Sequence, residues 1–328
     1  MTTCPPFSAD VLALDAEREC ERIAAWLRDQ LVTTLRRRCA VVAVSGGVDS
    51  AVCLGLACRA VGPARVLALH LPGPGSSTTS AERARLVCER FGVELQFHDL
   101  GPALAGLGNQ ERIDRAIGVV FPGLPAGTRH KIVLAGDLLE QDRANLFDLV
   151  VAMPDGSQER RRLPLDAYLQ LTAATNMQQR LRKLHEYTAA ESRNFAVLGT
   201  ANRLEHELGF FVRGGDGLAD VQLLAHLYKT QVWALARQLG VPPVIVDATP
   251  STETYSLPQT QEEFFFALPL RQLDLVLWAH DHGVADERIA AVLGLDPTQV
   301  QRVRADIEHK RRTALRLHRP PLRLEATS

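Results

Sequence analysis

The sequence predicts an α/β protein built on a doubly wound parallel sheet, with an inserted hairpin region and a helical C-terminal tail. Residues 40–44 are all apolar and mostly β-branched, which is typical of a strand buried on both faces of a parallel sheet. Along the first half of the chain, such short runs alternate with stretches in which apolar residues recur at helical spacing. Strand alternating with helix is the pattern of a parallel sheet covered by helices on both faces.

The expected elements follow in order. Residues 16–37 form an amphipathic helix by the spacing of their apolar side chains. Further strands are expected at residues 66–71, 93–97 and 195–198, and further helices from about Asp49, at 81–91 and at 223–239. The last of these helices should end at Gly240, a residue suited to a helix C-terminus, with Pro242 shortly after it.

Residues 100–170 interrupt this alternation. Glycine and proline are frequent at the start of this stretch, and residues 147–163 resemble a β-hairpin that turns at Pro154, Asp155 and Gly156. We therefore expect an α/β domain over residues 1–267 that carries residues 100–170 as an insertion. Residues 268–328 are expected to form a helical C-terminal region, in which Asp296 and Pro297 start a helix.

The composition narrows the class of protein. Of the 328 residues 46% are hydrophobic and 23% are charged, and the net charge of −1 argues against nucleic acid or a membrane surface as the main partner. No apolar run reaches the roughly 18 residues that a membrane span needs. No secretory signal is evident, and the six cysteines form no Cys-x-x-Cys pair. We expect a cytoplasmic protein with reduced thiols.

The loop after the first strand carries the expected chemistry. It has the three features of a phosphate-binding loop, namely a preceding strand, glycines that allow backbone N–H groups to approach phosphate, and a helix that begins after it. A carboxylate here would repel phosphate unless a cation intervenes, so Asp49 suggests Mg²⁺. The loop follows neither the Walker nor the dinucleotide-binding pattern. The residues expected to hold ATP are Ser45, Gly46, Gly47, Val48, Asp49 and Ser50.

This hexapeptide resembles the pyrophosphate-binding loop of the ATP-pyrophosphatase superfamily. Residues 176–183, 199–205, 209–220 and 227–232 resemble motifs of the NAD synthetase family in the same order. The resemblance implies an adenine nucleotide alpha hydrolase-like fold. It also implies a ligase that adenylates a carboxylate with ATP, releases pyrophosphate and transfers the acyl group to ammonia. The family's acid is nicotinic acid adenine dinucleotide, and its enzymes are homodimers.

Several residues outside the loop are candidates for the site. Glu205 follows a strand end, where ligands bind in open α/β sheets, and with Asp49 it would complete an oxygen-only Mg²⁺ site. Lys229 could neutralise the charge that develops on pyrophosphate. Arg180 and Arg182 lie two apart and do not share one helix face, and we expect Arg180 to face the site. Asp216 and Asp220 could bind metal, ammonium or substrate, or merely cap a turn.

The resemblance extends these roles. It implies catalytic roles for Lys229, Asp216 and Arg180, and ATP contacts from Thr200, Lys229 and Ser251. It implies that the acid is bound by Asn176, Arg180, Arg213, Asp216 and Asp220.

The sequence departs from the family where the acid should bind. Val212, Arg213 and Gly214 stand where the family has Thr-Lys-aromatic. A different carboxylic acid therefore remains an alternative substrate. Only about 40 residues precede the first strand, too few for the amidase domain of glutamine-using enzymes. We expect the nitrogen to come from free ammonia or from a separate glutaminase.

Two further hypotheses concern charged segments. The insertion follows the third strand, whose carboxyl end opens on the same edge as the phosphate loop, so residues 100–170 could cover the site as a lid. Its basic run, Arg160, Arg161 and Arg162, could then meet the substrate. Residues 285–304 resemble a helix-turn-helix, which leaves DNA binding as a remote alternative.

Overall fold

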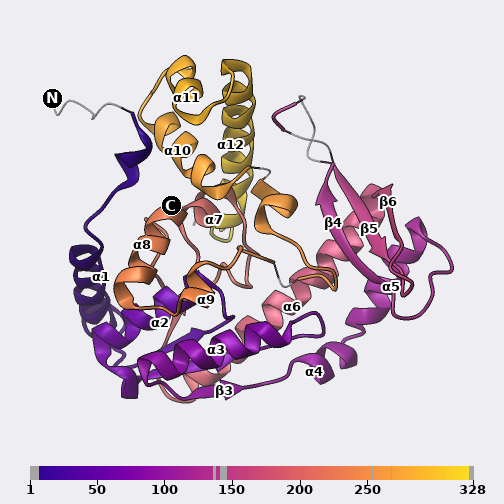
Figure 1. Ribbon diagram of the computed structural model, residues 1–328. Coiled ribbons are helices and arrows are strands. Elements are labelled where there is room, and N and C mark those ends of the chain that lie inside the picture. The colour runs from indigo at the N-terminus through magenta and orange to yellow at the C-terminus, as the bar shows by residue number, and fades with distance from the viewer. Residues whose placement is uncertain (1–6, 136–137, 141–145, 253, 267, 325–328) are drawn as a thin grey trace.

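A five-stranded parallel sheet forms the centre of the computed structural model, which describes residues 7–135, 138–140, 146–252, 254–266 and 268–324 (Figure 1). The strand order is β3-β2-β1-β7-β8, and every neighbouring pair is parallel. This order confirms the doubly wound sheet. The strands are β1 (Ala40–Ala43), β2 (Val66–His70), β3 (Leu95–Phe97), β7 (Ala196–Gly199) and β8 (Val221–Gln222).

Helices cover both faces of this sheet because successive side chains of a strand point to opposite faces. On β1, Ala40 and Val42 are buried in the main core, whereas Val41 is buried in a second cluster on the opposite face. The first face carries α1 (Ala16–Asp29), α2 (Val48–Val61), α3 (Thr78–Phe91) and α8 (Lys229–Leu239), and the second carries α4 (Gly101–Gly106) and α6 (Leu165–Glu191).

A second, antiparallel sheet lies to one side of the parallel sheet (Figure 1). The expected hairpin is present as β5 (Phe147–Ala152) and β6 (Gln158–Arg162). A third strand, β4 (Arg129–Leu134), pairs with β5 and was not expected from the sequence. α5 (Asn109–Val120) and the start of α6 pack on this sheet. The predicted limit of the insertion at residue 170 cuts into α6, which begins at Leu165.

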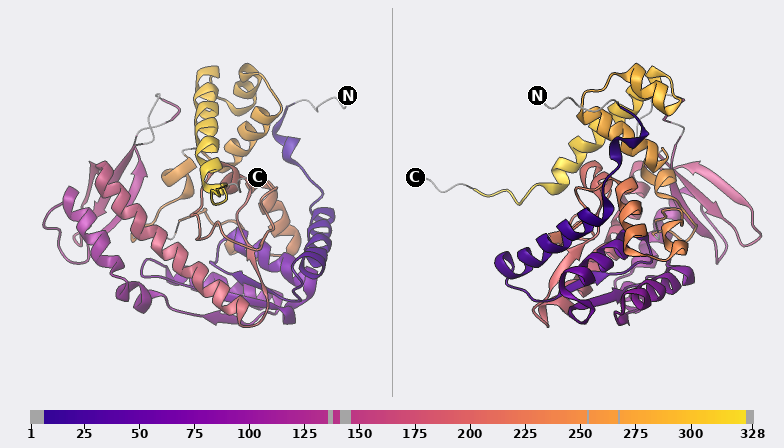
Figure 2. Two further views of the ribbon diagram at one scale, coloured as in Figure 1. Left: turned by 180° about the vertical axis from the view of Figure 1, so that it is seen from behind. Right: turned by 60° about the vertical axis from the view of Figure 1, so that its left-hand side comes forward.

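The C-terminal region is helical, as predicted, and packs beside α8 and α7 (Arg203–Leu208) (Figure 2). Its helices are α10 (Leu270–Asp281), α11 (Asp286–Leu293) and α12 (Pro297–His318). Asp296 caps α12, because its side chain accepts a hydrogen bond from the Gln299 amide. The remaining short elements are η1 (Ala9–Leu12), η2 (Gln30–Thr34), η3 (Pro63–Arg65), α9 (Pro243–Val246) and η4 (Glu262–Phe266).

The helix expected at residues 223–239 begins later than predicted, at Lys229. Leu223, Leu224 and Leu227 lie in a loop and are buried. Their spacing in the sequence is like that of the apolar face of a helix, which is why a helix was predicted there. None of the described helices is both long enough and apolar enough to cross a bilayer.

Candidate active site

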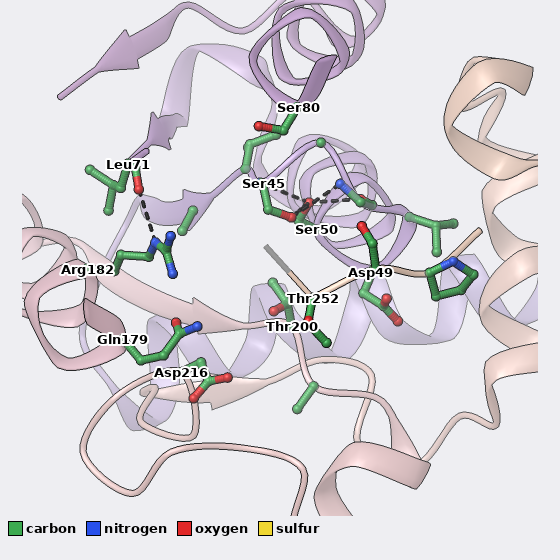
Figure 3. A pocket seen from close by; sticks show the side chains of 18 of the residues that line it. Ser45, Asp49, Ser50, Leu71, Ser80, Gln179, Arg182, Thr200, Asp216 and Thr252 are labelled. Atoms are coloured by element: carbon green, nitrogen blue, oxygen red, sulfur yellow. Dashed lines mark hydrogen bonds between the residues drawn. The ribbon is translucent and has the colours of Figure 1, made fainter. Parts of the chain in front are cut away.

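A cavity of about 300 Å³ opens at the carboxyl ends of β1 and β7. Connections run outward in opposite directions from these two neighbouring strands, so this is the switch point at which open α/β sheets bind their ligands. The loops that follow β1, β2 and β7 contribute to its wall, as does α6. Figure 3 shows Asp49 on one side of the cavity and Gln179, Arg182 and Asp216 on the other.

The predicted phosphate loop lines this cavity with all six of its residues. Gly46 has a φ of 86°, and a Cβ on it would lie 2.5 Å from the Ser80 carbonyl oxygen, so the loop needs glycine there. Ser45 Oγ accepts a hydrogen bond from the Gly47 amide (3.2 Å), and Ser50 Oγ donates one to the Gly47 carbonyl (2.9 Å). These bonds fix the loop just before α2 begins at Val48.

Asp49 and Glu205 bring two carboxylates together beside the loop. Asn202 links them, because its amide group donates to Asp49 Oδ1 (3.0 Å) and its backbone N–H donates to Glu205 Oε2 (3.1 Å). Burial and the charge of Asp49 together raise the pKa of Glu205 to about 8, although the charge of Lys229 opposes the rise. A cation bound between the two carboxylates would reduce their mutual repulsion.

Oxygen donors of this kind suit Mg²⁺, so the residues fit the metal that the sequence suggested. Among the described residues no cluster of three or more histidines, cysteines or carboxylates could enclose a metal. Mg²⁺ commonly takes its remaining ligands from phosphates and water, so two carboxylates are sufficient protein donors.

Lys229 places a positive charge in the same wall. Its side chain is 1% exposed, and its Nζ donates to Asp49 Oδ2. Burial lowers its pKa, but the charges of Asp49 and Glu205 outweigh burial and leave the pKa raised. Lys229 is therefore a charged donor. Thr200 and Ser251, the other residues expected to contact ATP, also line the cavity.

Of the two aspartates proposed to bind the acid, Asp216 lines the cavity and Asp220 does not. Its carboxylate accepts a hydrogen bond from the Val212 amide (2.6 Å), and burial raises its pKa. Asp220 lies elsewhere, since it accepts from the Val197 amide (2.8 Å) and the Tyr187 hydroxyl (3.2 Å). Asp220 therefore ties its loop to β7.

The expectation that Arg180 faces the site, rather than Arg182, is wrong about position. Arg182 lines the cavity and donates to the Leu71 carbonyl (3.0 Å; Figure 3). Arg180 lies outside the cavity and donates to the carbonyl of Arg213 (3.3 Å). Two residues span about 200° of a helix, so only one of the two could face inward. Asn176 and Arg213, both proposed for the acid, also lie outside the cavity wall.

Several residues of the cavity wall were not predicted from the sequence. Lys183 and Glu186 line the wall of α6 as a buried ion pair with an N–O distance of 2.7 Å. Charges three residues apart on the inward face of this helix were a readable signal. Gln261 donates to Glu205 Oε1 (3.2 Å), and nothing in the sequence announced this contact. Arg83 also lines the cavity, and its buried Nε has no hydrogen-bond partner in the part of the chain that is described.

The basic run of the insertion makes local contacts instead of lining the cavity. Arg160 and Arg162 pair with Asp148 (2.8 and 3.3 Å). Arg161 pairs with Glu159 (2.7 Å), and its guanidinium lies over the Phe121 ring. No described residue between 100 and 170 is part of the cavity wall. A role of the insertion as a lid stays a prediction.

Comparisons with a family model and with individual proteins point to the same family. The family model described as NAD synthase matches residues 19–116 and 110–314. An NH(3)-dependent NAD(+) synthetase of Rhizobium meliloti (strain 1021) is 48% identical over 315 residues, which cover 96% of this chain and 94% of that protein. The enzyme of the same description from Thermotoga maritima is 34% identical, over 83% of this chain and 88% of that protein.

Solved structures share the fold. A structure of NMN synthetase from Francisella tularensis has a TM-score of 0.65 at 21% identity, over 96% of this chain and all of that one. The NH3-dependent NAD synthetase from Campylobacter jejuni has a TM-score of 0.62 at 19% identity, over 95% of this chain and all of that one. At these identities the two structures support the architecture alone.

Proposed function

The chain belongs to the NAD synthase family, a family of ATP-using carbon–nitrogen ligases, and we propose that it amidates nicotinic acid adenine dinucleotide to NAD(+) with ammonia and ATP. The observation that carries the proposal is the cluster of Asp49, Glu205 and Lys229 beside a phosphate loop at the switch point of the sheet. The high identity to NH(3)-dependent NAD(+) synthetases over nearly the whole chain supports this acid.

In the first step the substrate carboxylate oxygen attacks the α-phosphorus of ATP, the bond between the α-phosphorus and the bridging oxygen breaks, and pyrophosphate leaves. Backbone N–H groups of the loop at residues 45–50 and the start of α2 hold the phosphates. Lys229 offsets the negative charge that grows on the leaving group. Mg²⁺, bound by Asp49 and Glu205, would supply further charge neutralisation.

In the second step ammonia attacks the acyl carbon of the adenylate, AMP leaves with the electron pair of the broken bond, and the nitrogen releases a proton. Asp216 lies in the cavity wall, buried and with a raised pKa. A carboxylate with a raised pKa in this position can hold ammonium or accept the proton. We assign Asp216 this role, and we assign Arg182 the substrate contact that was expected of Arg180.

The substrate loop still differs from the family pattern, so a different carboxylic acid remains the second candidate. A panel of carboxylic acids, assayed for ATP-dependent pyrophosphate release with ammonium as the nitrogen donor, tests the assignment. Nicotinic acid adenine dinucleotide is expected to have the highest kcat/KM. A higher kcat/KM for another acid would transfer the proposal to that acid.

DNA binding by the C-terminal helices receives no support, because three of their cations are engaged within the fold. Arg302 donates to the Leu139 carbonyl (2.8 Å), and Arg304 pairs with Asp286 (3.0 Å). Lys310 pairs with Asp306 (2.6 Å).

We also propose a homodimer in the cytoplasm. An outward stripe on α6 carries the exposed apolar side chains of Leu165, Leu169 and Leu184, which a second copy could cover. Ammonia is taken as free ammonia or from a separate glutaminase.

A further inference from the structure

The first turn of α8, which begins with Lys229, is capped by a residue from another helix. Helix starts leave backbone N–H groups without partners inside the helix. Here Asp274 of α10 accepts hydrogen bonds from the amides of Lys229 (3.2 Å) and Thr230 (2.7 Å), and a third from the Thr230 hydroxyl (2.7 Å). The carboxylate of Asp274 therefore holds both Lys229 and Thr230, the first two residues of α8.

The buried position of Asp274 costs folding free energy, because its carboxylate loses its contact with water. Its side chain is 0% exposed, and its neighbours Leu273, Leu275 and Val276 are buried apolar residues. Burial raises the pKa of Asp274, and the pKa remains at about 6 although the three hydrogen-bond donors and the charge of Lys229 lower it. A well-packed apolar residue would avoid the cost of desolvating a charge. The presence of a carboxylate here therefore indicates a role other than packing.

α10 also docks on α8 through contacts that do not involve this carboxylate. The Arg271 guanidinium of α10 lies 4.9 Å from the centre of the Trp233 ring of α8. Val276 and Leu277 of α10 share the main core with Val232 and Leu235 of α8. These contacts hold the helices together, whereas the contacts of Asp274 act only on the first turn of α8.

We propose that Asp274 is a positioning residue, which fixes the start of α8 so that Lys229 Nζ meets Asp49 and the pyrophosphate leaving group. The proposal rests on the proposed function. It makes the C-terminal helical region part of the adenylation site, although none of the residues described between 268 and 324 is in the cavity wall. A lysine at the first position of a helix moves with the cap, and small displacements of a catalytic group are costly in rate.

The test compares Asp274→Asn and Thr230→Val with the control Asp286→Asn. Asp274→Asn keeps the size of the side chain but replaces one acceptor oxygen with a donor. Thr230→Val removes one of the three hydrogen bonds and leaves the carboxylate. Asp286→Asn removes a carboxylate that pairs with Arg304 in the same region, away from Lys229. ATP–pyrophosphate exchange in the presence of nicotinic acid adenine dinucleotide isolates the adenylation step from ammonia.

We expect Asp274→Asn to lower kcat for exchange by about 30-fold, with KM for the acid within about threefold of the wild type. Thr230→Val should lower kcat by about fivefold, and Asp286→Asn should retain it. If Asp274→Asn does not fold, Thr230→Val decides. A wild-type kcat in Asp274→Asn or in Thr230→Val would overturn the positioning role, as would an equal loss in Asp286→Asn. A wild-type protein without any exchange would instead count against the proposed function.

Discussion

The side-chain amide of Asn202 donates a 3.0 Å hydrogen bond to Asp49 Oδ1, although 153 positions separate the two residues. Asn202 is also the N-cap of α7, the helix that carries Glu205. One residue thus sets the relative position of the phosphate loop and of the second carboxylate. The geometry of the site depends on this connection between the ends of β1 and β7.

The two carboxylates are expected to be essential for adenylation. Asp49→Asn and Glu205→Gln should each lower kcat for pyrophosphate release at least about 100-fold, because each removes negative charge that a bound Mg²⁺ needs. Glu207→Gln is the matched control, since Glu207 lies on the same helix but pairs with Arg203 (2.5 Å). Rates near wild type in both site variants at saturating Mg²⁺ would contradict the metal site.

Gly46 should not tolerate a side chain. Gly46→Ala is expected to weaken ATP binding at least about tenfold, because a Cβ would meet the Ser80 carbonyl and φ is 86°. Gly62→Ala is a matched control with a φ of 84° but no atom within 4 Å of the added Cβ. The control should cost about 1 kcal/mol of stability and leave ATP affinity unchanged. Calorimetric titration with ATP compares the two variants, and equal affinities would refute the role of close packing at Gly46.

The two arginines of α6 should differ in their effect. Arg182→Gln is expected to raise KM for ATP or for the acid by about tenfold, because it removes a positive charge from the cavity wall. Arg180→Gln should change neither KM by more than about threefold, since its side chain lies outside the wall. Steady-state kinetics would disprove this assignment if Arg180→Gln had the larger effect.

Acid should destabilise the protein in part through His130 of β4. Burial lowers its pKa from 6.5 to about 4, so the folded state binds fewer protons than the unfolded state between these values. Its contribution is present above pH 6.5 and is lost as pH falls towards 4, by up to about 3 kcal/mol. As pH falls from 6.5 to about 4, the melting temperature of His130→Gln should fall less than that of the wild type. An unchanged slope would show that other groups carry the acid sensitivity.

The sequence was informative where local chemistry fixes local structure. The residues of the phosphate loop could be recognised because strand, glycines and helix start are adjacent in the chain. Glu205 and Lys229 were found because they follow strand ends or begin a helix in a matching motif.

Contacts between distant segments could not be predicted in this way. Nothing near Asp274 indicates that it caps α8, and nothing near Gln261 indicates that it reaches Glu205. Periodicity showed that only one of Arg180 and Arg182 faces inward but not which one, because that depends on how α6 lies on the sheet. The strand β4 was missed because its first half, Arg129, His130 and Lys131, is polar, so β4 lacks the continuous apolar run from which the other strands were predicted.

The route of the carboxylate oxygen distinguishes adenylation of the acid from its phosphorylation. With ¹⁸O in the carboxylate of nicotinic acid adenine dinucleotide, ATP and ammonium, attack on the α-phosphorus transfers one labelled oxygen to AMP. We expect one AMP with one ¹⁸O, and one unlabelled pyrophosphate, for each NAD(+) formed. Formation of ADP with labelled orthophosphate, or of unlabelled AMP, would contradict adenylation of the carboxylate.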